Sequence, residues 1–152
     1  MTDRILDEPL DLDALLRETR DEACGGVSVF AGTVREENRG RRVEWLEYEA
    51  QVPVAERVLR ELEEEVLERF EARRCRIQHR VGRLEPGETS VLVVVRAPHR
   101  ADAFAGCRHA IDELKERLPV WKEERYTDGS SHWLEGTSLS TESSAETGEA
   151  EG

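Results

Sequence analysis

Three stretches of the chain carry apolar residues at the three- and four-residue spacing of an amphipathic helix. The first, Asp11 to Thr19, is short and has leucines among acidic residues. The second runs from Pro53 to about Arg73, and the third lies between Pro98 and Pro119. The expected buried side of the third helix consists of Phe104, Cys107, Ile111, Leu114 and Leu118. The spacing therefore predicts two main helices and one short helix.

The segments between these helices have the composition of β-strands. Gly26 to Val34 is rich in β-branched residues, and Ser90 to Val95 is apolar on both faces, which is typical of a central strand. Apolar and polar residues alternate from Cys75 to Val81. This alternation predicts a half-buried strand with His79 facing inward as a hydrogen-bonded core residue.

Shorter patterns complete the expected fold. Strands are predicted around Val43 to Glu49, from Val120 to Tyr126 and from Ser131 to Glu135, whereas the polar run Glu36 to Arg42 is expected to be a mobile loop. Turn signals such as Asp128-Gly129 between neighbouring strands favour antiparallel pairing. The elements together predict an α+β fold with a single domain and a mixed, largely antiparallel sheet.

The chain is expected to contain one folded domain, residues 1–135, and an acidic tail. Its 152 residues are the length of one ordinary domain. Residues 136–152 are mostly Ser, Thr, Glu, Gly and Ala, with a single leucine and no cation. Such a segment cannot bury enough apolar surface to order itself, so we expect this tail to be disordered.

The formal net charge of −12 and a pI near 4.9 narrow the range of partners. An acidic surface repels nucleic-acid phosphates and anionic lipid headgroups, so neither nucleic acid nor a membrane is expected as a partner. No stretch approaches the roughly 18 apolar residues of a membrane-spanning helix, and Met1 to Leu6 lacks the apolar core of a signal peptide. We therefore expect a cytoplasmic protein.

The three cysteines, Cys24, Cys75 and Cys107, are odd in number and widely spaced, which argues against a disulfide framework or a zinc knuckle. A cysteine nucleophile activated by a nearby histidine is one alternative, but a small buried hydrophobic residue is the commoner role. The acidic residues between Glu61 and Glu68 are likewise interpreted as a solvated helix face rather than a metal site. We expect no metal ion.

The two lysines are the most informative feature of the composition. Of the 22 basic residues, only Lys115 and Lys122 are lysine, and the others are arginine. An amine can lose its proton when it is desolvated or crowded by cations, so lysine can act as an acid, a base or a nucleophile. Both lysines are therefore candidate catalytic residues. The alternative is chance survival during a general replacement of lysine by arginine.

Other cations stand where the chain is suited to bind an anion. His99 and Arg100 lie where a strand passes into the third helix, and a helix N-terminus attracts anions such as phosphate. The alternative is that Arg100 pairs with Asp102 while His99 caps the helix. Arg35, at the exit of the first long strand, is another candidate anion donor.

The positions of the lysines favour a shared pocket. Lys115 is expected near the end of the third helix, beside its buried row, where its amine would be partly shielded. Lys122 follows the break at Pro119, where the chain can reverse and bring the two amines together. In a pocket of converging cations, the positive charges favour deprotonated amines, which are the reactive form near neutral pH.

Eight ordered motifs resemble those of one known family. They are Phe30-Ala-Gly-Thr-Val-Arg35, Leu46-Glu-Tyr-Glu-Ala50, His79-Arg-Val-Gly82, Pro86-Gly-Glu88, His99-Arg-Ala-Asp-Ala-Phe104, Asp112-Glu-Leu-Lys115, Pro119-Val-Trp-Lys-Glu123, and Asp128-Gly129 with Trp133. Over about residues 4 to 135 the chain resembles the large, catalytic subunit of molybdopterin synthase. Each motif is weak alone, but all of them in the same order with compatible spacing are specific.

The resemblance implies an α/β-hammerhead fold and a sulfurtransferase activity. In that family, sulfur passes from the C-terminal thiocarboxylate of a small ubiquitin-like carrier, whose Gly-Gly tail enters a pocket, to cyclic pyranopterin monophosphate. The product is molybdopterin, and no metal or cofactor is implied for this step. A homodimer completes the pocket, and small subunits at its two ends make a heterotetramer.

The resemblance also implies roles for particular residues. By position, Lys115 and Lys122 match the two essential lysines of the family. The implied substrate-binding residues are Thr33, Val34, Arg35, His99, Arg100, Lys115, Lys122, Glu123 and Glu124. Thr33 departs from the pattern, because some members of the family carry a basic residue there, and the acidic tail has no recognised counterpart.

Two other functions are compatible with the same residues. A lysine that forms a Schiff base with a carbonyl substrate would also use isolated amines, and trapping with borohydride would detect it. A non-catalytic scaffold would use the His99-Arg100 junction only to hold a phosphate-bearing partner. Turnover of a thiocarboxylated carrier and the pyranopterin substrate distinguishes a synthase from both.

Overall fold

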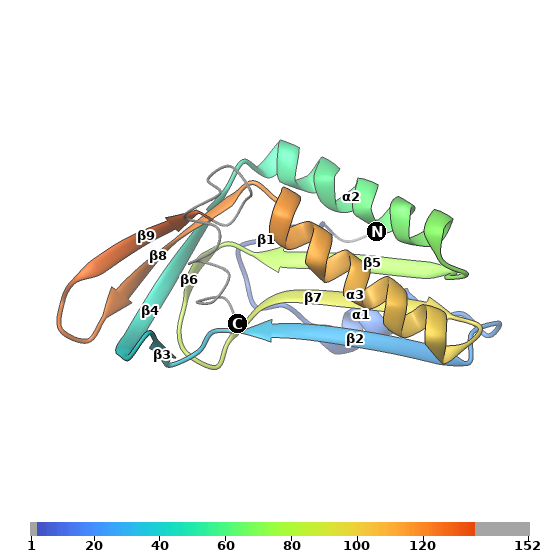
Figure 1. The fold of residues 1–152 in the computed structure, drawn as a ribbon, viewed down its shortest axis with the longest axis horizontal. Helices are drawn as coiled ribbons and strands as arrows, with labels where there is room; N and C mark the ends of the chain where they lie inside the picture. The colour runs from blue at the N-terminus through green and yellow to red at the C-terminus, as the bar shows by residue number, and fades with distance from the viewer. Residues whose placement is uncertain (1–2, 136–152) are drawn as a thin grey trace.

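The computed structural model describes residues 3–135, which form two β-sheets and three helices (Figure 1). The expected tail, residues 136–152, lies outside the described residues. Across the first sheet the strands are β1 (Ile5–Leu6), β5 (Arg74–Arg80), β7 (Thr89–Ala97) and β2 (Gly26–Thr33). The second sheet contains β3 (Glu37–Asn38), β4 (Arg41–Ala50), β8 (Val120–Tyr126) and β9 (Ser131–Glu135), and β6 (Gly82–Leu84) also pairs with β4.

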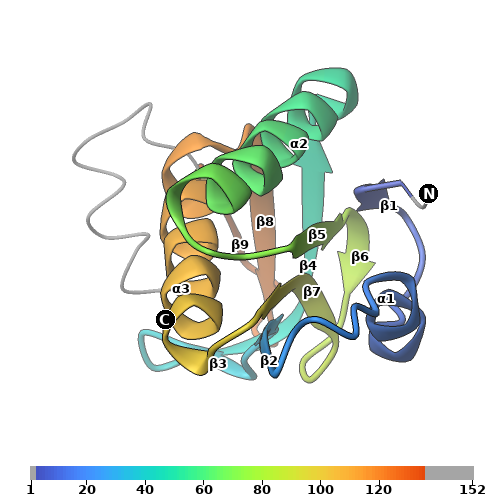
Figure 2. The ribbon, with the colours of Figure 1, turned by 90° about the vertical axis from the view of Figure 1, so that its right-hand side faces the viewer.

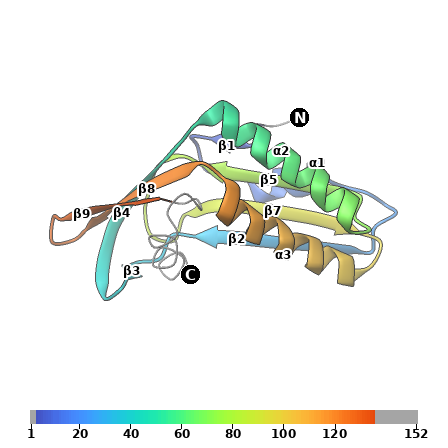
Figure 3. The same ribbon diagram turned by 45° about the horizontal axis from the view of Figure 1, so that its top comes forward.

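Strand pairing confirms the prediction of a mixed, largely antiparallel α+β fold. Within residues 3–135, β1 runs parallel to β5 and the other strand pairs are antiparallel. The strands divide between two sheets, however. β4 leads into one of the two long helices, and the other long helix leads into β8 (Figure 3). The two sheets therefore meet where strands and helices join.

The helices α1 (Leu12–Glu18), α2 (Val52–Arg69) and α3 (Arg100–Arg117) correspond to the three predicted helices. α2 and α3 cover one face of the first sheet, whereas α1 packs on the other face against Leu92 and Val94 of β7 (Figure 2). Because both faces of β7 are covered, its central residues Val91 to Val95 are all apolar, as the sequence predicted for a central strand. None of the helices in the described part of the chain is long and apolar enough to cross a membrane.

α3 lies close to the first sheet because its buried stripe consists mainly of small residues. A β-carbon added at Gly106 would lie only 3.1 Å from Val66 and 3.3 Å from Val95. The prediction that Phe104 lies on the buried side of α3 was wrong, since its side chain is 66% exposed. Neighbouring helical residues point about 100° apart, so burial of Ala103 turns Phe104 outward.

β5 is buried on both faces rather than half-buried as predicted. Arg76, which the alternation placed on the outer face, is 6% exposed and donates hydrogen bonds to Glu18 of α1 and Glu63 of α2, at 2.6 Å and 3.1 Å. Paired carboxylates make it possible to bury a charged residue, and sequence alternation does not reveal such pairs. His79 is buried as predicted, and its Nδ1 bonds the carbonyl oxygen of Arg80 at 2.8 Å.

The segment Glu36 to Arg42 contains a tight hairpin rather than the predicted loop. β3 pairs with β4, with Asn38 opposite Arg41. Arg39 and Gly40 between them have φ values of 54° and 77°, and positive φ at both central residues is the geometry of a type I′ turn. Asn38 is thereby fixed at the inner end of this hairpin, where its side chain is 7% exposed.

Candidate active site

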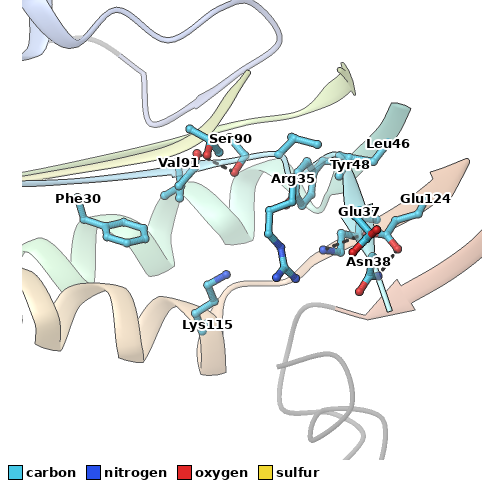
Figure 4. A pocket seen from close by; sticks show the side chains of 14 residues that line it. Phe30, Arg35, Glu37, Asn38, Leu46, Tyr48, Ser90, Val91, Lys115 and Glu124 are labelled. Carbon is cyan, nitrogen blue, oxygen red and sulfur yellow. Dashed lines mark hydrogen bonds and ion pairs between the residues drawn. The ribbon is translucent and has the colours of Figure 1, made fainter. Parts of the chain in front are cut away.

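A pocket lies at the junction of the two sheets (Figure 4). Its walls come from the end of β2, the β3–β4 hairpin, β8 and the last turns of α3. The residues proposed from the sequence that line this pocket are Thr33, Val34, Arg35, Lys115, Lys122 and Glu124. The fold therefore brings both lysines of the chain to one cavity.

The end of α3 places the two lysines on either side of a sharp change in backbone direction. Leu118 caps the helix with φ −77° and ψ 123°, and Pro119 cannot continue it because it lacks an N–H donor. β8 then begins at Val120, and its alternate residues share the buried face, which places Lys122 there. Lys122 is 5% exposed, whereas Lys115 is exposed rather than partly shielded as predicted.

Arg35 reaches the pocket because the residue before it is anchored. The N–H of Val34 donates to the carbonyl of Glu88 at 2.9 Å, and the N–H of Gly87 donates to the carbonyl of Val34 at 2.8 Å. The Val34 side chain is buried in a second small core beneath β4. Arg35 is exposed, and Figure 4 shows it and Lys115 extending toward the same space from different elements.

Glu124 connects the buried lysine to the hairpin. Its Oε1 accepts hydrogen bonds from Nδ2 of Asn38 at 2.5 Å and from the hydroxyl of Tyr126 at 2.9 Å. Its Oε2 lies 3.9 Å from Nζ of Lys122. Glu124 is only 3% exposed, so the ion pair lies in a water-poor environment where electrostatic attraction is stronger than at the surface.

Tyr126 remains protonated in this cluster. Burial, the hydrogen bond that Tyr126 donates to Glu124 and the negative charge of Glu124 together raise the pKa of Tyr126 to about 12. Arg41, whose guanidinium carbon lies 3.8 Å from the centroid of the Tyr126 ring, opposes the rise because a cation favours the phenolate. At neutral pH the phenol therefore has a proton to donate to Glu124.

Three residues proposed from the sequence lie away from the pocket within one chain. His99 is the N-cap of α3, without a side-chain cap bond, and Arg100 is its first residue, and both are exposed. Lys115 is 15 residues after Arg100, which corresponds to about 22 Å along a helix. Glu123 points to the opposite face of β8 from Lys122, because neighbouring strand residues alternate.

Asn38 and Tyr126 contact the site but were not among the residues proposed from the sequence. Two signals in the sequence would have identified them. Arg39-Gly40 ahead of the predicted strand at Val43 is compatible with a tight hairpin, which would have placed Asn38 next to a strand. The alternation in β8 places Tyr126 on the same face as Lys122 and Glu124.

The cysteines lie outside the pocket lining, and their thiols are poorly activated. All three are free. Burial raises the pKa of the Cys75 thiol far above its ordinary value and also raises that of Cys107, and burial together with the charge of Asp21 raises that of Cys24. A protonated thiol is a poor nucleophile, so the structural role is favoured for each. Within residues 3–135, no group of three or more His, Cys, Asp or Glu side chains is arranged to hold a metal ion.

The pocket is a cationic site on an acidic chain. Arg35, Lys115 and Lys122 line it together with the carboxylates Glu37 and Glu124, in a chain whose formal net charge is −12. An anionic ligand is attracted to such a cavity and repelled elsewhere on the surface. Lysine amines can also transfer protons or stabilise a developing negative charge. The fold and site are therefore those of an α+β enzyme whose pocket is suited to anionic ligands.

Comparison with known proteins identifies the family. Residues 5–117 match the family described as MoaE protein. A molybdopterin synthase catalytic subunit of Nostoc sp. is 44% identical over 127 residues, which are 83% of this chain and 77% of that protein. The crystal structure of molybdopterin synthase from Staphylococcus aureus has a TM-score of 0.84 at 38% identity, and the similarity covers 88% of this chain and 98% of that chain. The chain therefore belongs to the MoaE family of molybdopterin synthase catalytic subunits.

A more distant structure shares the fold. The complex of subunits 1 and 2 of molybdopterin-converting factor from Helicobacter pylori contains a chain with a TM-score of 0.70 at 21% identity, covering 86% of this chain and 88% of that chain. The family membership confirms the resemblance found in the sequence and the prediction of an enzyme of molybdenum cofactor biosynthesis. The roles of individual residues stay predictions.

Proposed function

We propose that this chain inserts sulfur into cyclic pyranopterin monophosphate and so forms the dithiolene of molybdopterin. The sulfur donor is the thiocarboxylated C-terminus of a small ubiquitin-like carrier that ends in Gly-Gly. Lys115 and Lys122 are the catalytic residues. The observation that carries this proposal is that the only two lysines of the sequence line one pocket together with Arg35.

The charges of the pocket suit this reaction because both reactants are anions. A thiocarboxylate and a cyclic phosphate are each attracted to the cations of the pocket and repelled by the acidic surface around it. Arg35, which is exposed, offers a planar guanidinium suited to phosphate or carboxylate oxygens. Thr33 and Val34 bring their backbone to the same wall, so their proposed contribution is to substrate binding.

The two lysines differ in their surroundings, and we assign them different roles. Lys122 is buried and lies near a carboxylate, so its amine has a fixed position from which it stabilises negative charge on the oxygen of the attacked carbon. Lys115 is exposed at the end of α3, where an incoming carrier tail can reach it. Its proposed role is to transfer protons during sulfur addition.

The remaining candidate cations, His99 and Arg100, are proposed to reach the pocket from a second copy of the chain. His99 and Arg100 are separated from Lys115 by about 22 Å along α3, which is beyond the reach of a side chain. We propose a homodimer in which His99 and Arg100 of one copy bind the substrate in the pocket of the other. The Helicobacter pylori complex of two different subunits supports a small partner subunit, and hence a heterotetramer. The expected cytoplasmic location stays a prediction.

Turnover tests the proposed reaction directly. Purified chain, thiocarboxylated carrier and cyclic pyranopterin monophosphate should yield molybdopterin, and Lys115→Ala should abolish the product while the circular dichroism spectrum stays unchanged. Arg117→Ala is the matched control, because Arg117 lies two residues further along α3 and pairs with Glu65 and Glu113. Full activity of Lys115→Ala would show that the catalytic residue is wrongly assigned.

Mixing two inactive variants tests the shared pocket. If His99 acts across a dimer, Lys115→Ala and His99→Ala chains should restore activity when they are unfolded and refolded together, because one pocket of each mixed dimer then has both residues. Random pairing gives mixed dimers in half of the assemblies, so recovery of up to about a quarter of the wild-type rate is expected. No recovery above the separate variants would contradict the shared pocket.

A further inference from the structure

We infer that Asn38 and Tyr126 are positioning residues for the reaction, which hold the carboxylate of Glu124 so that its second oxygen faces Lys122. This inference rests on the proposed function, because that function gives Lys122 its catalytic role. Neither residue belongs to the set implied by the family resemblance. Both act on the reaction through another side chain.

The geometry of the two hydrogen bonds determines which oxygen faces the lysine. Asn38 and Tyr126 both donate to Oε1 of Glu124, at 2.5 Å and 2.9 Å. Oε2 is the oxygen that lies 3.9 Å from Nζ of Lys122. The terminal torsion of a glutamate is broad, so rotamer preference alone does not fix the carboxylate plane. Two donors on one oxygen fix that plane.

The two donors come from different parts of the fold. Tyr126 lies two residues after Glu124 on the same face of β8, whereas Asn38 lies on β3, 86 residues earlier in the chain. Figure 4 shows Asn38 and Glu124 next to each other at one end of the pocket. The hairpin that carries Asn38 is thereby coupled to the strand that carries Lys122.

Burial makes this arrangement strong. Asn38, Lys122, Glu124 and Tyr126 are 7%, 5%, 3% and 4% exposed, so water competes weakly for their hydrogen bonds. Hydrogen bonds to a charged acceptor are stronger than those between neutral groups. A carboxylate held in this way keeps its orientation while the substrate and the carrier tail enter and leave.

A variant of Tyr126 can distinguish a positioning effect from the loss of a direct contact with the substrate. Asn38, Lys122 and Glu124 line the pocket, whereas Tyr126 lies outside its lining. An effect of Tyr126 on the reaction must therefore pass through a neighbour, and its hydroxyl bonds Glu124. For this reason Tyr126→Phe, which removes one oxygen and keeps the ring, is the most informative variant.

The test measures kcat and KM separately for the full chain with thiocarboxylated carrier and cyclic pyranopterin monophosphate. Tyr126→Phe and Asn38→Ala should each lower kcat about tenfold, the effect expected for loss of a hydrogen bond to a charged group. The KM for each substrate should change less than about twofold, because an interaction that acts in the transition state mainly affects kcat. The matched control is Ser130→Ala, in the β8–β9 turn, whose hydroxyl donates to Asp128 at 2.5 Å.

A double-mutant cycle shows whether the effect passes through Glu124. In a Glu124→Gln background, which itself has reduced activity, Tyr126→Phe should cause no further loss of kcat. An equal loss in both backgrounds would indicate a general structural effect and overturn the inference, as would a wild-type kcat for Tyr126→Phe in an otherwise active enzyme. Should Tyr126→Phe unfold, Asn38→Ala on the separate hairpin provides the same comparison.

The outcomes also separate this inference from the proposed function. A wild-type chain that makes no molybdopterin overturns the proposed function and the positioning role with it. An active wild-type chain whose Asn38 and Tyr126 variants keep the wild-type kcat overturns the positioning role alone. Reduced kcat with unchanged KM, absent in the Ser130→Ala control, supports both.

Discussion

The ionisation of Tyr126 offers a direct measurement of the cluster around Glu124. Burial, the hydrogen bond to Glu124 and the charge of Glu124 together raise the pKa of this phenol from its ordinary 10.0 to about 12, and burial is the largest cause. At roughly 1.4 kcal/mol per pKa unit, the difference corresponds to about 3 kcal/mol in favour of the protonated phenol. The perturbation that isolates the contribution of Glu124 is Glu124→Gln, which removes the charge and keeps an acceptor oxygen.

The expected result is a partial fall in the pKa of Tyr126. Because burial is the largest cause and persists in Glu124→Gln, the pKa should decrease but stay above its ordinary value. The assay follows the near-ultraviolet absorbance of tyrosinate with increasing pH, over the range in which circular dichroism shows a folded chain. The sequence contains two tyrosines, Tyr48 and Tyr126, and Tyr126→Phe identifies the signal of the second.

The same shift makes stability depend on pH. The pKa of Tyr126 is higher in the folded chain than in the unfolded chain, so its contribution is fully present below pH 10 and is lost as the pH rises from about 10 to about 12. Urea unfolding should show a loss of about 3 kcal/mol over this range, and a smaller loss in Glu124→Gln. Ionisation of Tyr126 near its ordinary value, or an unchanged titration of Tyr126 in Glu124→Gln, would refute this reasoning.

Three further predictions concern stability and can be measured by urea unfolding. Glu63→Gln should cost about 3 kcal/mol, because the buried Glu63 pairs with the partly buried Arg4 at 2.8 Å and with the buried Arg76 at 3.1 Å, and a cost below about 1 kcal/mol would show that the network contributes little. Gly106→Leu should destabilise by about 1–3 kcal/mol through overpacking against α2 and β7, and wild-type stability would mean that α3 can move away from the sheet. Phe104→Ser should change stability by no more than about 0.5 kcal/mol because Phe104 is 66% exposed, and a larger loss would place that side chain in a contact.

Much of the fold was predictable because it depends on local periodicity. The spacing of apolar residues predicted α1, α2 and α3, and the apolar run in β7 predicted a strand covered on both faces. The errors arose where packing or pairing overrode the local pattern. Phe104 is apolar but exposed, since Ala103 and Gly106 allow a closer approach to the sheet. Arg76 of β5 is charged but buried, since carboxylates from α1 and α2 pair with it.

The sequence by itself determined the elements, the identity of the two lysines and the order of the family motifs, because each of these is a property of neighbouring residues or of their succession along the chain. Only the tertiary structure decided that Lys115, Lys122 and Arg35 line one pocket and that His99 and Arg100 lie at the far end of α3. It also decided that Asn38 bonds a carboxylate 86 residues away. Such contacts result from the packing of whole sheets and helices, which brings distant segments of the chain together. No local sequence pattern predicts that packing.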